Sequence, residues 1–232
     1  VGAGLLDQFR DGVYFIDLAP LANPEEIGQA VAAALDFQAP DKSKPPFPQL
    51  LKALGHQNLL LILDNFEHLL DGAARVNDLL QAGPEVAVLA TSRQRLNLAS
   101  ESRYELGGLD FPDWLTPEDA LAYTAVQLFV ENGRRAQPLF SLNQTNVTDV
   151  TRICQLVKGM PLGLVLAASW LALLTPAEIA AEIENNLDFL TAELADLPSR
   201  QRSMRAVFDY SWQMLAPAEQ SVLARLSVFR GG

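Results

Sequence analysis

The chain has 232 residues, of which 49% are hydrophobic and 19% are charged, a composition that excludes a disordered protein. Its 17 basic and 28 acidic residues give a net charge of −11, which argues against direct contact with nucleic acid. The single cysteine, Cys154, excludes an internal disulfide and favours a reducing compartment, the cytoplasm. The longest apolar stretch, residues 162–174, is too short to cross a bilayer, so we expect no membrane span.

The first half of the chain alternates short apolar runs with helical patterns. The continuous apolar run at 59–63 is typical of a central strand covered on both faces. Because strands alternate with helices, the sequence predicts a parallel sheet with right-handed crossovers. In chain order, the expected elements are a strand at 13–18, helices at 24–35 and 49–54, a strand at 59–63, a helix at 67–81, a strand at 86–90 and a weaker strand at 103–106.

The second half has almost no strand signal. Several of its helical patterns have a proline near their first turn, a position where the missing N–H costs nothing. The expected helices are at 116–133, at 147–157, from Pro161, from Pro176, at 199–214 and at 217–229. The sequence therefore predicts the α/β class, with an all-helical second part.

Two predicted strands end in residues that can bind a nucleotide. Asp64 follows at least four apolar residues, the pattern of a Walker B motif, whose carboxylate holds Mg²⁺ beside nucleotide phosphates. An ordinary strand end, at which Asp64 caps the next helix, explains that pattern equally well. The next strand ends in Thr91-Ser92-Arg93, and an arginine there can contact a terminal phosphate with its planar fork of donors. Taken alone, Arg93 is better explained as a surface residue that starts a turn.

Together, the two strand ends resemble the STAND class of ATPases, the NB-ARC-like switches of large bacterial regulators and of cell-death and immune sensors. In that class a Walker B strand is followed by a helix and by a sensor strand that ends in Thr/Ser-Arg. The segment 159–164, Gly-Met-Pro-Leu-Gly-Leu, resembles the family's Gly-Leu-Pro-Leu motif, and residues 207–217 and 226–229 resemble the opening helices of its winged-helix domain. The resemblance implies a partial P-loop NTPase domain at 1–110, a helical domain at 111–198 and the beginning of a winged-helix domain at 199–232.

The resemblance also implies roles for individual residues, with ATP or ADP and Mg²⁺ as cofactors of the full-length protein. Asp64 would help to hold Mg²⁺, often through water, and Arg93 would sense the γ-phosphate. Pro161 would pack on the nucleotide base, with Gly159 and Leu162 shaping its turn. A proline at a helix start suits this contact because it presents a rigid apolar face.

The sequence departs from the family at the residue after Asp64. Many relatives have a second acid there that polarises the attacking water, whereas this chain has Asn65, whose amide cannot act as a base. Glu67 is the nearest carboxylate. Our hypothesis is that Glu67 polarises the attacking water in place of the missing acid. Hydrolysis is accordingly expected to be slow or absent.

A second departure is that the phosphate-binding pattern G-x-x-x-x-G-K-[ST] does not occur in the sequence. The family places it just before the segment that resembles residues 6–18, so residues 1–10 would be the tail of the P-loop helix. We therefore expect the chain as given to bind ATP weakly or not at all and to be inactive as an ATPase. Strand edges left unpaired would favour self-association.

Two functions remain open from the sequence. The first is a nucleotide-dependent switch in a multidomain regulator of signalling or transcription, closed with ADP and opened by ATP. Its partners would be other domains of the same polypeptide, a DNA-binding domain and sensor repeats. The second is a non-catalytic interaction or oligomerisation scaffold that keeps only the fold, which Asn65 and the missing phosphate loop favour. A Gly-Lys-Thr/Ser loop encoded just before Val1 would support the switch.

Overall fold

The computed structural model describes residues 2–112, 117–191 and 203–227. The chain forms two compact units, 1–104 and 105–232. Unit 1 combines a three-stranded parallel sheet with helices, and the described part of unit 2 is helical apart from one isolated bridge between Thr191 and Ser203. The fold therefore belongs to the α/β class, as the sequence predicts. The expected domain boundary between residues 198 and 199 lies outside the described residues.

The sheet of unit 1 has the strand order β1-β2-β3, and both strand pairs are parallel. The apolar run at 59–63 forms the middle strand. The register pairs Asp17 with Asp64 and Leu63 with Ala90, so the carboxyl ends of the three strands finish at one edge. The strands are β1 (Val13–Asp17), β2 (Leu59–Asp64) and β3 (Val86–Ala90).

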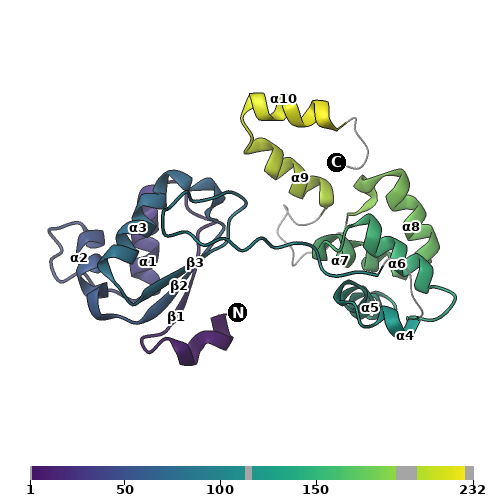
Figure 1. Ribbon diagram of the computed structural model, residues 1–232, viewed down its shortest axis with the longest axis horizontal. Helices are drawn as coiled ribbons and strands as arrows, with labels where there is room; N and C mark the ends of the chain where they lie inside the picture. The colour runs from purple at the N-terminus through teal and green to yellow at the C-terminus, as the bar shows by residue number, and fades with distance from the viewer. Residues whose placement is uncertain (1, 113–116, 192–202, 228–232) are drawn as a thin grey trace. The chain divides into compact units, whose positions relative to one another are not determined.

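Three α-helices cover one face of this sheet (Figure 1). Their apolar side chains form a core with Ile16, Leu61 and Leu63, which share a face because alternate residues of a strand point to the same side. The helices and 3-10 turns of unit 1 are η1 (Gly2–Gln8), η2 (Pro24–Glu26), α1 (Ile27–Ala34), α2 (Pro46–Ala53), η3 (Leu54–His56), η4 (Phe66–His68), η5 (Leu70–Gly72) and α3 (Ala73–Ala82).

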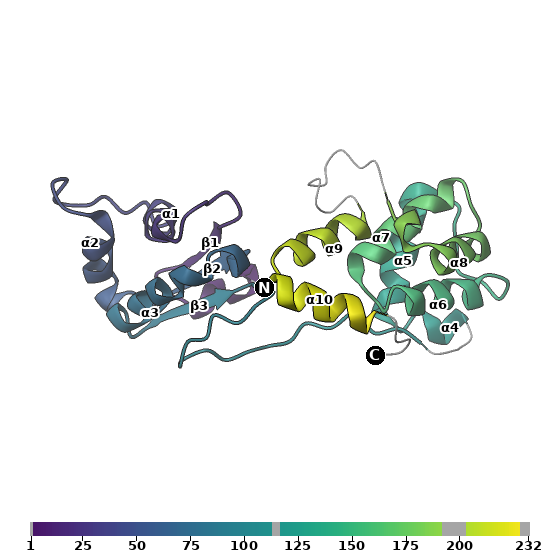
Figure 2. The ribbon, with the colours of Figure 1, turned by 90° about the horizontal axis from the view of Figure 1, so that it is seen from above.

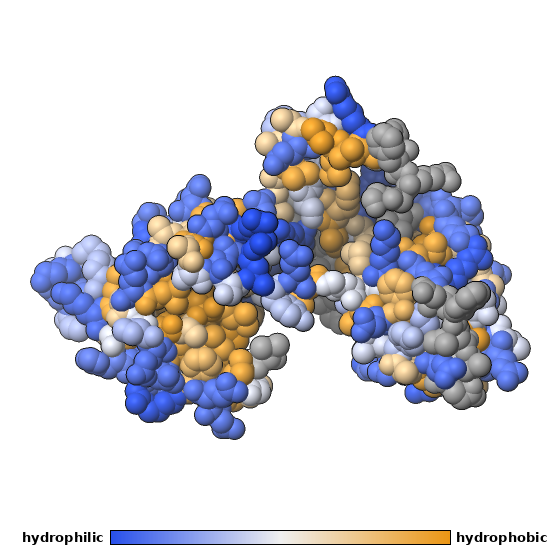
Figure 3. All heavy atoms as spheres, viewed as in Figure 1, coloured by the Kyte–Doolittle hydropathy of each residue, from blue (hydrophilic) through white to orange (hydrophobic). Residues whose placement is uncertain are grey.

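Fewer elements of unit 1 pack on the opposite face of the sheet. The turn η1 lies on it, since an added Cβ on Gly2 would be 2.8 Å from Ile62 Cδ1. Phe15 on this face is 62% exposed and Leu89 is 40% exposed, and Figure 3 shows apolar surface over the strands of unit 1. The middle strand β2 is nevertheless largely buried on both faces, since Leu60 on this face is 4% exposed and Leu61 on the other is fully buried, as expected of a central strand. Both right-handed crossovers run in the same direction along the sheet, which places their helices on the same side.

Two predicted elements of unit 1 differ from the structure. The helix expected at 67–81 begins only at Ala73, because Leu69, with φ −120° and ψ 26°, leaves the helical region and the chain around it forms the 3-10 turns η4 and η5. The strand expected at 103–106 is wrong. No described strand pairs with it, and the exposure of Tyr104 and Leu106, each 87%, shows that its apolar side chains have no surface to pack on.

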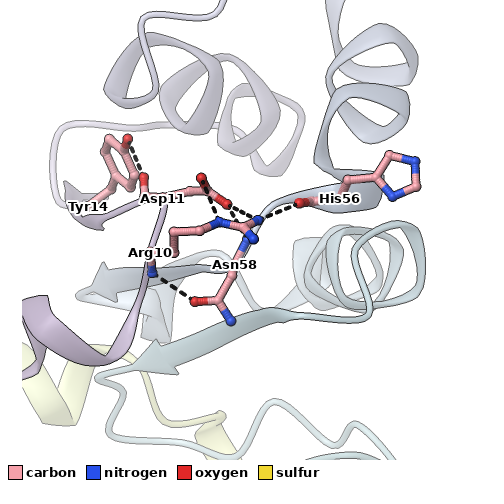
Figure 4. Close-up of polar contacts among 5 residues, drawn as sticks. All are labelled: Arg10, Asp11, Tyr14, His56 and Asn58. Carbon is pink, nitrogen blue, oxygen red and sulfur yellow. Dashed lines mark hydrogen bonds and ion pairs between the residues drawn. The ribbon is translucent and has the colours of Figure 1, made fainter.

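A polar cluster joins the amino-terminal ends of β1 and β2 (Figure 4). The backbone N–H of Asn58 donates to Asp11 Oδ2 at 2.7 Å, and the backbone N–H of Arg10 donates to Asn58 Oδ1 at 2.9 Å. Arg10 Nη2 lies 3.0 Å from Asp11 Oδ2 and 3.2 Å from the carbonyl oxygen of His56. The Arg10 guanidinium, followed by the N–H of Asn58, lowers the pKa of the Asp11 carboxyl. The cluster fixes the start of the sheet, at the edge opposite to Asp64.

Unit 2 is a set of helices around a second apolar core. Helix α5 packs on α7, and α6 packs on α8. Phe129 and Phe140 meet edge to face in this core, with ring centroids 6.1 Å apart. Figure 2 shows α5 to α8 together. The elements are α4 (Pro117–Ala120), α5 (Thr124–Ala136), α6 (Val147–Leu156), α7 (Pro161–Ser169), η6 (Trp170–Ala172), α8 (Pro176–Asn185), η7 (Leu187–Phe189), α9 (Met204–Gln213) and α10 (Pro217–Leu226).

The helix starts at Pro161 and Pro176 are confirmed, and the helix expected at 116–133 is instead two helices. The break lies at Tyr123, whose ψ of 132° is extended rather than helical, and the free N–H of Ala125 in the first turn of α5 donates to the carbonyl oxygen of Asp110 at 3.1 Å. The helices expected at 199–214 and 217–229 are found as α9 and α10, and residues 199–202 and 228–229 lie outside the described residues. Within the described ranges, no helix is both long and apolar enough to cross a membrane.

Candidate functional site

The carboxyl edge of the sheet brings together side chains that the sequence singles out. Asp64 ends β2, and Thr91 directly follows β3. Thr91 Oγ1 donates to Asp64 Oδ1 at 2.5 Å and accepts from the backbone N–H of Asn65 at 3.0 Å. Asp17 ends β1 in register with Asp64, and its Oδ1 accepts from the N–H of Ala19 at 2.9 Å. Ligands of parallel α/β sheets bind at this edge of the strands.

Asn65 turns the chain out of β2. Its φ of 62° and ψ of 53° lie in the left-handed region, which asparagine, aspartate and glycine adopt most readily. The turn η4 follows directly and places Phe66 and Glu67 in the interior. This backbone conformation therefore decides where the next carboxylate lies.

Glu67 and Arg93 form an ion pair beside these strand ends. Glu67 Oε1 lies 3.5 Å from Arg93 Nε. The Glu67 side chain is 4% exposed, whereas the Arg93 side chain is 39% exposed. A buried carboxylate needs a cation or hydrogen-bond donors to offset its lost hydration, and Arg93 supplies the cation.

Asp64 and Arg93 are the residues at this edge that are suited to a cation and to a phosphate, respectively. Among the described residues, no group of three or more His, Cys, Asp or Glu side chains can hold a metal ion. A magnesium site built only from protein ligands therefore does not fit here. Mg²⁺ usually keeps several waters and takes one or two carboxylates together with substrate phosphates, and Asp64 fits that requirement.

The turn between α6 and α7 carries the other predicted site residues, and it forms a Schellman motif. Lys158 has φ 50°, the N–H of Lys158 donates to the carbonyl of Gln155, and the N–H of Gly159 donates to the carbonyl of Cys154. Pro161 then begins α7 with its ring exposed, and Leu162 packs partly against the core of unit 2.

Gly159 is required at this turn by a close backbone contact. Its φ is 65°, and a Cβ added to it would lie 2.0 Å from the carbonyl oxygen of Leu109. The N–H of Leu109 donates to the Gly159 carbonyl at 2.8 Å, so the segment around Leu109 lies directly on the turn. A cavity of about 610 Å³ opens beside this contact. Its lining comprises Gly108, Leu109, Asp110, Phe111, Ala122, Tyr123, Thr124 and Lys158.

The structure thus groups the predicted site residues in two places. Asp64, Glu67 and Arg93 lie together at the sheet edge of unit 1. Gly159, Pro161 and Leu162 lie together at one turn of unit 2. Sequence reasoning missed the hydroxyl of Thr91, although its position beside Arg93 at a strand end was a signal. It also missed Leu109, for which the sequence has no signal because the contact is made by backbone atoms.

No family model matches the chain. The chain is 34% identical over 227 residues to a Mycobacterium tuberculosis protein provisionally named an HTH-type transcriptional regulator, and the same figures hold for its Mycobacterium bovis counterpart. That alignment covers 97% of this chain and 24% of the relative. The chain is also 28% identical over 233 residues to an uncharacterized M. tuberculosis protein, with coverage of 100% of this chain and 56% of that protein. The chain therefore spans about a quarter of the first relative and just over half of the second.

Proposed function

We propose that this chain is part of a nucleotide-dependent switch, alternating between ADP and ATP, in a multidomain regulator of transcription. The observation that carries the proposal is the grouping of Asp64, Thr91 and the Glu67–Arg93 pair at the carboxyl edge of two adjacent parallel strands. A carboxylate for a hydrated cation and an arginine beside it match the charges of a magnesium-bound triphosphate. The regulatory output is supported by the 34% identity to the HTH-type regulator.

The proposed switch gives each strand end a separate task. Asp64 would hold the hydrated Mg²⁺, which neutralises phosphate charge when it is bound. Arg93, whose side chain is 39% exposed, would contact the γ-phosphate. ADP lacks that phosphate, so Arg93 is the residue that distinguishes the two nucleotides.

Asn65 favours a second candidate, a non-catalytic scaffold that keeps the fold without hydrolysis. An amide cannot accept a proton from water, and Glu67, the nearest carboxylate in sequence, is already paired with Arg93. The exposed apolar side chains Phe15 and Leu89 on the open sheet face agree with a role in association.

Nucleotide binding to the full-length protein distinguishes the two candidates. Equilibrium dialysis with ATP and ADP in the presence of Mg²⁺ should give micromolar affinity for both. Arg93→Ala should weaken ATP binding by about ten- to a hundredfold, the value of a lost charge-assisted hydrogen bond, and leave ADP binding unchanged. Arg95→Ala, an exposed arginine two residues further along, is the matched control. Absence of binding of either nucleotide would support the scaffold.

A further inference from the structure

The hydroxyl of Thr91 has a fixed orientation between two strand ends. It accepts the N–H of Asn65 at 3.0 Å and donates to Asp64 Oδ1 at 2.5 Å. A hydroxyl has one proton, so this arrangement commits that proton to Asp64. The terminal torsion of an aspartate is otherwise broad, and a donor held at one oxygen restricts the rotation of the carboxylate.

The Thr91 backbone is held on both sides, which makes the hydroxyl a rigid support. The N–H of Thr91 donates to the carbonyl of Leu63 at 2.9 Å, and the N–H of Phe66 donates to the carbonyl of Thr91 at 2.9 Å. Threonine is also β-branched, which limits its χ1 rotation. Thr91 therefore does not depend on Asp64 for its own placement.

Asp64 offers its second oxygen to other ligands. Thr91 occupies Oδ1, and no hydrogen bond or ion pair reaches Oδ2 from the described part of the chain. A carboxylate held in this way presents one oxygen in a defined direction. That is the requirement for a monodentate contact to a hydrated Mg²⁺ ion.

We propose that Thr91 is a positioning residue, whose hydroxyl holds Asp64 Oδ1 so that Oδ2 faces the hydrated Mg²⁺ ion that accompanies the nucleotide. The proposal rests on the proposed nucleotide switch and adds a determinant of its magnesium affinity. Hydrogen-bond partners of metal-binding side chains typically change metal affinity by about ten- to a hundredfold. Thr91 is expected to act in that range.

The test is the Mg²⁺ dependence of ADP binding to the full-length protein, measured by equilibrium dialysis from EDTA to millimolar Mg²⁺. Thr91→Val keeps the shape and removes the hydroxyl, Thr91→Ser keeps the hydroxyl, and Asp64→Asn removes the charge. The Mg²⁺ midpoint should rise by about tenfold or more in Thr91→Val and in Asp64→Asn and should stay near wild type in Thr91→Ser. ADP affinity in EDTA should be the same in all four proteins. Thr91→Ala replaces the valine variant if that one fails to fold.

The outcomes separate this inference from the function on which it rests. A midpoint that moves in Asp64→Asn but not in Thr91→Val would overturn the positioning role and leave the switch intact. A midpoint that moves in neither variant, or no ADP binding by wild type, would overturn the proposed function together with the inference. Loss of ADP binding in EDTA for Thr91→Val would show a merely structural role.

Discussion

The carboxylate of Glu67, whose side chain is 4% exposed, lies 3.5 Å from the guanidinium of Arg93, whose side chain is 39% exposed. Arg93→Ala leaves this carboxylate without its cation and should lower the free energy of unfolding by about 1–3 kcal/mol. Urea denaturation measures the change. The control, Arg95→Ala, should lower the free energy of unfolding by about 0.5 kcal/mol or less. Adding Glu67→Gln should restore part of the loss because it removes the uncompensated charge. A double variant no more stable than Arg93→Ala would show that the ion pair is not the cause.

Hydrolysis tests the second role considered for Glu67. If its carboxylate replaces the acid that Asn65 lacks, Glu67→Gln should slow single-turnover ATP cleavage by the full-length protein about a hundredfold or more. Rapid quench with labelled ATP measures the rate at saturating nucleotide, which separates cleavage from binding. An unchanged rate rejects the substitute role.

Gly159 should be intolerant of a side chain. Gly159→Ala combines a left-handed backbone with a Cβ 2.0 Å from the Leu109 carbonyl oxygen, so the backbone must move. We expect a loss of about 2–4 kcal/mol in the free energy of unfolding, measured by thermal or urea denaturation. Gly107→Ala is the matched control, since a Cβ there meets no atom within 4 Å. Equal effects of the two substitutions would contradict the close-contact argument.

Cys154 should react slowly with thiol reagents in the folded protein. Burial raises the pKa of its thiol from 9.0 to about 12, so the native protein holds about a thousandfold less thiolate at pH 8. Its reaction with DTNB should be slow in buffer and fast in urea. Because the neutral thiol is favoured in the folded state, its stabilising contribution is complete below pH 9 and is lost as pH rises toward 12. Rapid labelling in buffer would mean that α6 opens readily.

Acid should weaken the cluster at the start of the sheet. The pKa of Asp11 lies below its ordinary value of 3.8 because Arg10 and the N–H of Asn58 stabilise the carboxylate. A lowered pKa contributes stability above pH 3.8, and that contribution disappears as pH falls through the folded-state value. Thermal melting from pH 7 to pH 2 should show a smaller acid-induced drop for Asp11→Asn than for wild type. If the melting temperatures of Asp11→Asn and wild type fall equally with pH, other groups cause the acid sensitivity.

Much of the fold follows from local patterns in the sequence. The apolar run at 59–63 had to be a buried strand, and the prolines at 161 and 176 marked helix starts because both signals are local. The delayed start of α3 was not predictable, since it depends on the non-helical backbone of Leu69, which no local signal marks. The failed strand at 103–106 had the right composition but no partner in the described sheet. Strand pairing is a property of the whole fold rather than of a segment.

The sequence predicts where the candidate site lies but not the contacts within it. Asp64 and Arg93 follow neighbouring strands, and parallel strands bring their ends to one edge, so both could be placed there from the sequence. The Glu67–Arg93 ion pair could not, because a regular helix from residue 67 would have directed Glu67 differently from the turn η4. The contact of Gly159 with Leu109 joins backbone atoms 50 residues apart, and no side-chain pattern encodes it.

Position 65 has a left-handed backbone conformation, which only a few residue types adopt readily, so few substitutions of Asn65 are expected to be accepted in evolution. Aspartate is one of them, and a single base change in an asparagine codon produces it. The route from this protein to one with a second acid beside Asp64 is therefore one mutational step that leaves the backbone undisturbed. If the proposed switch is correct, this single step would supply the acid that Asn65 lacks without rebuilding the domain.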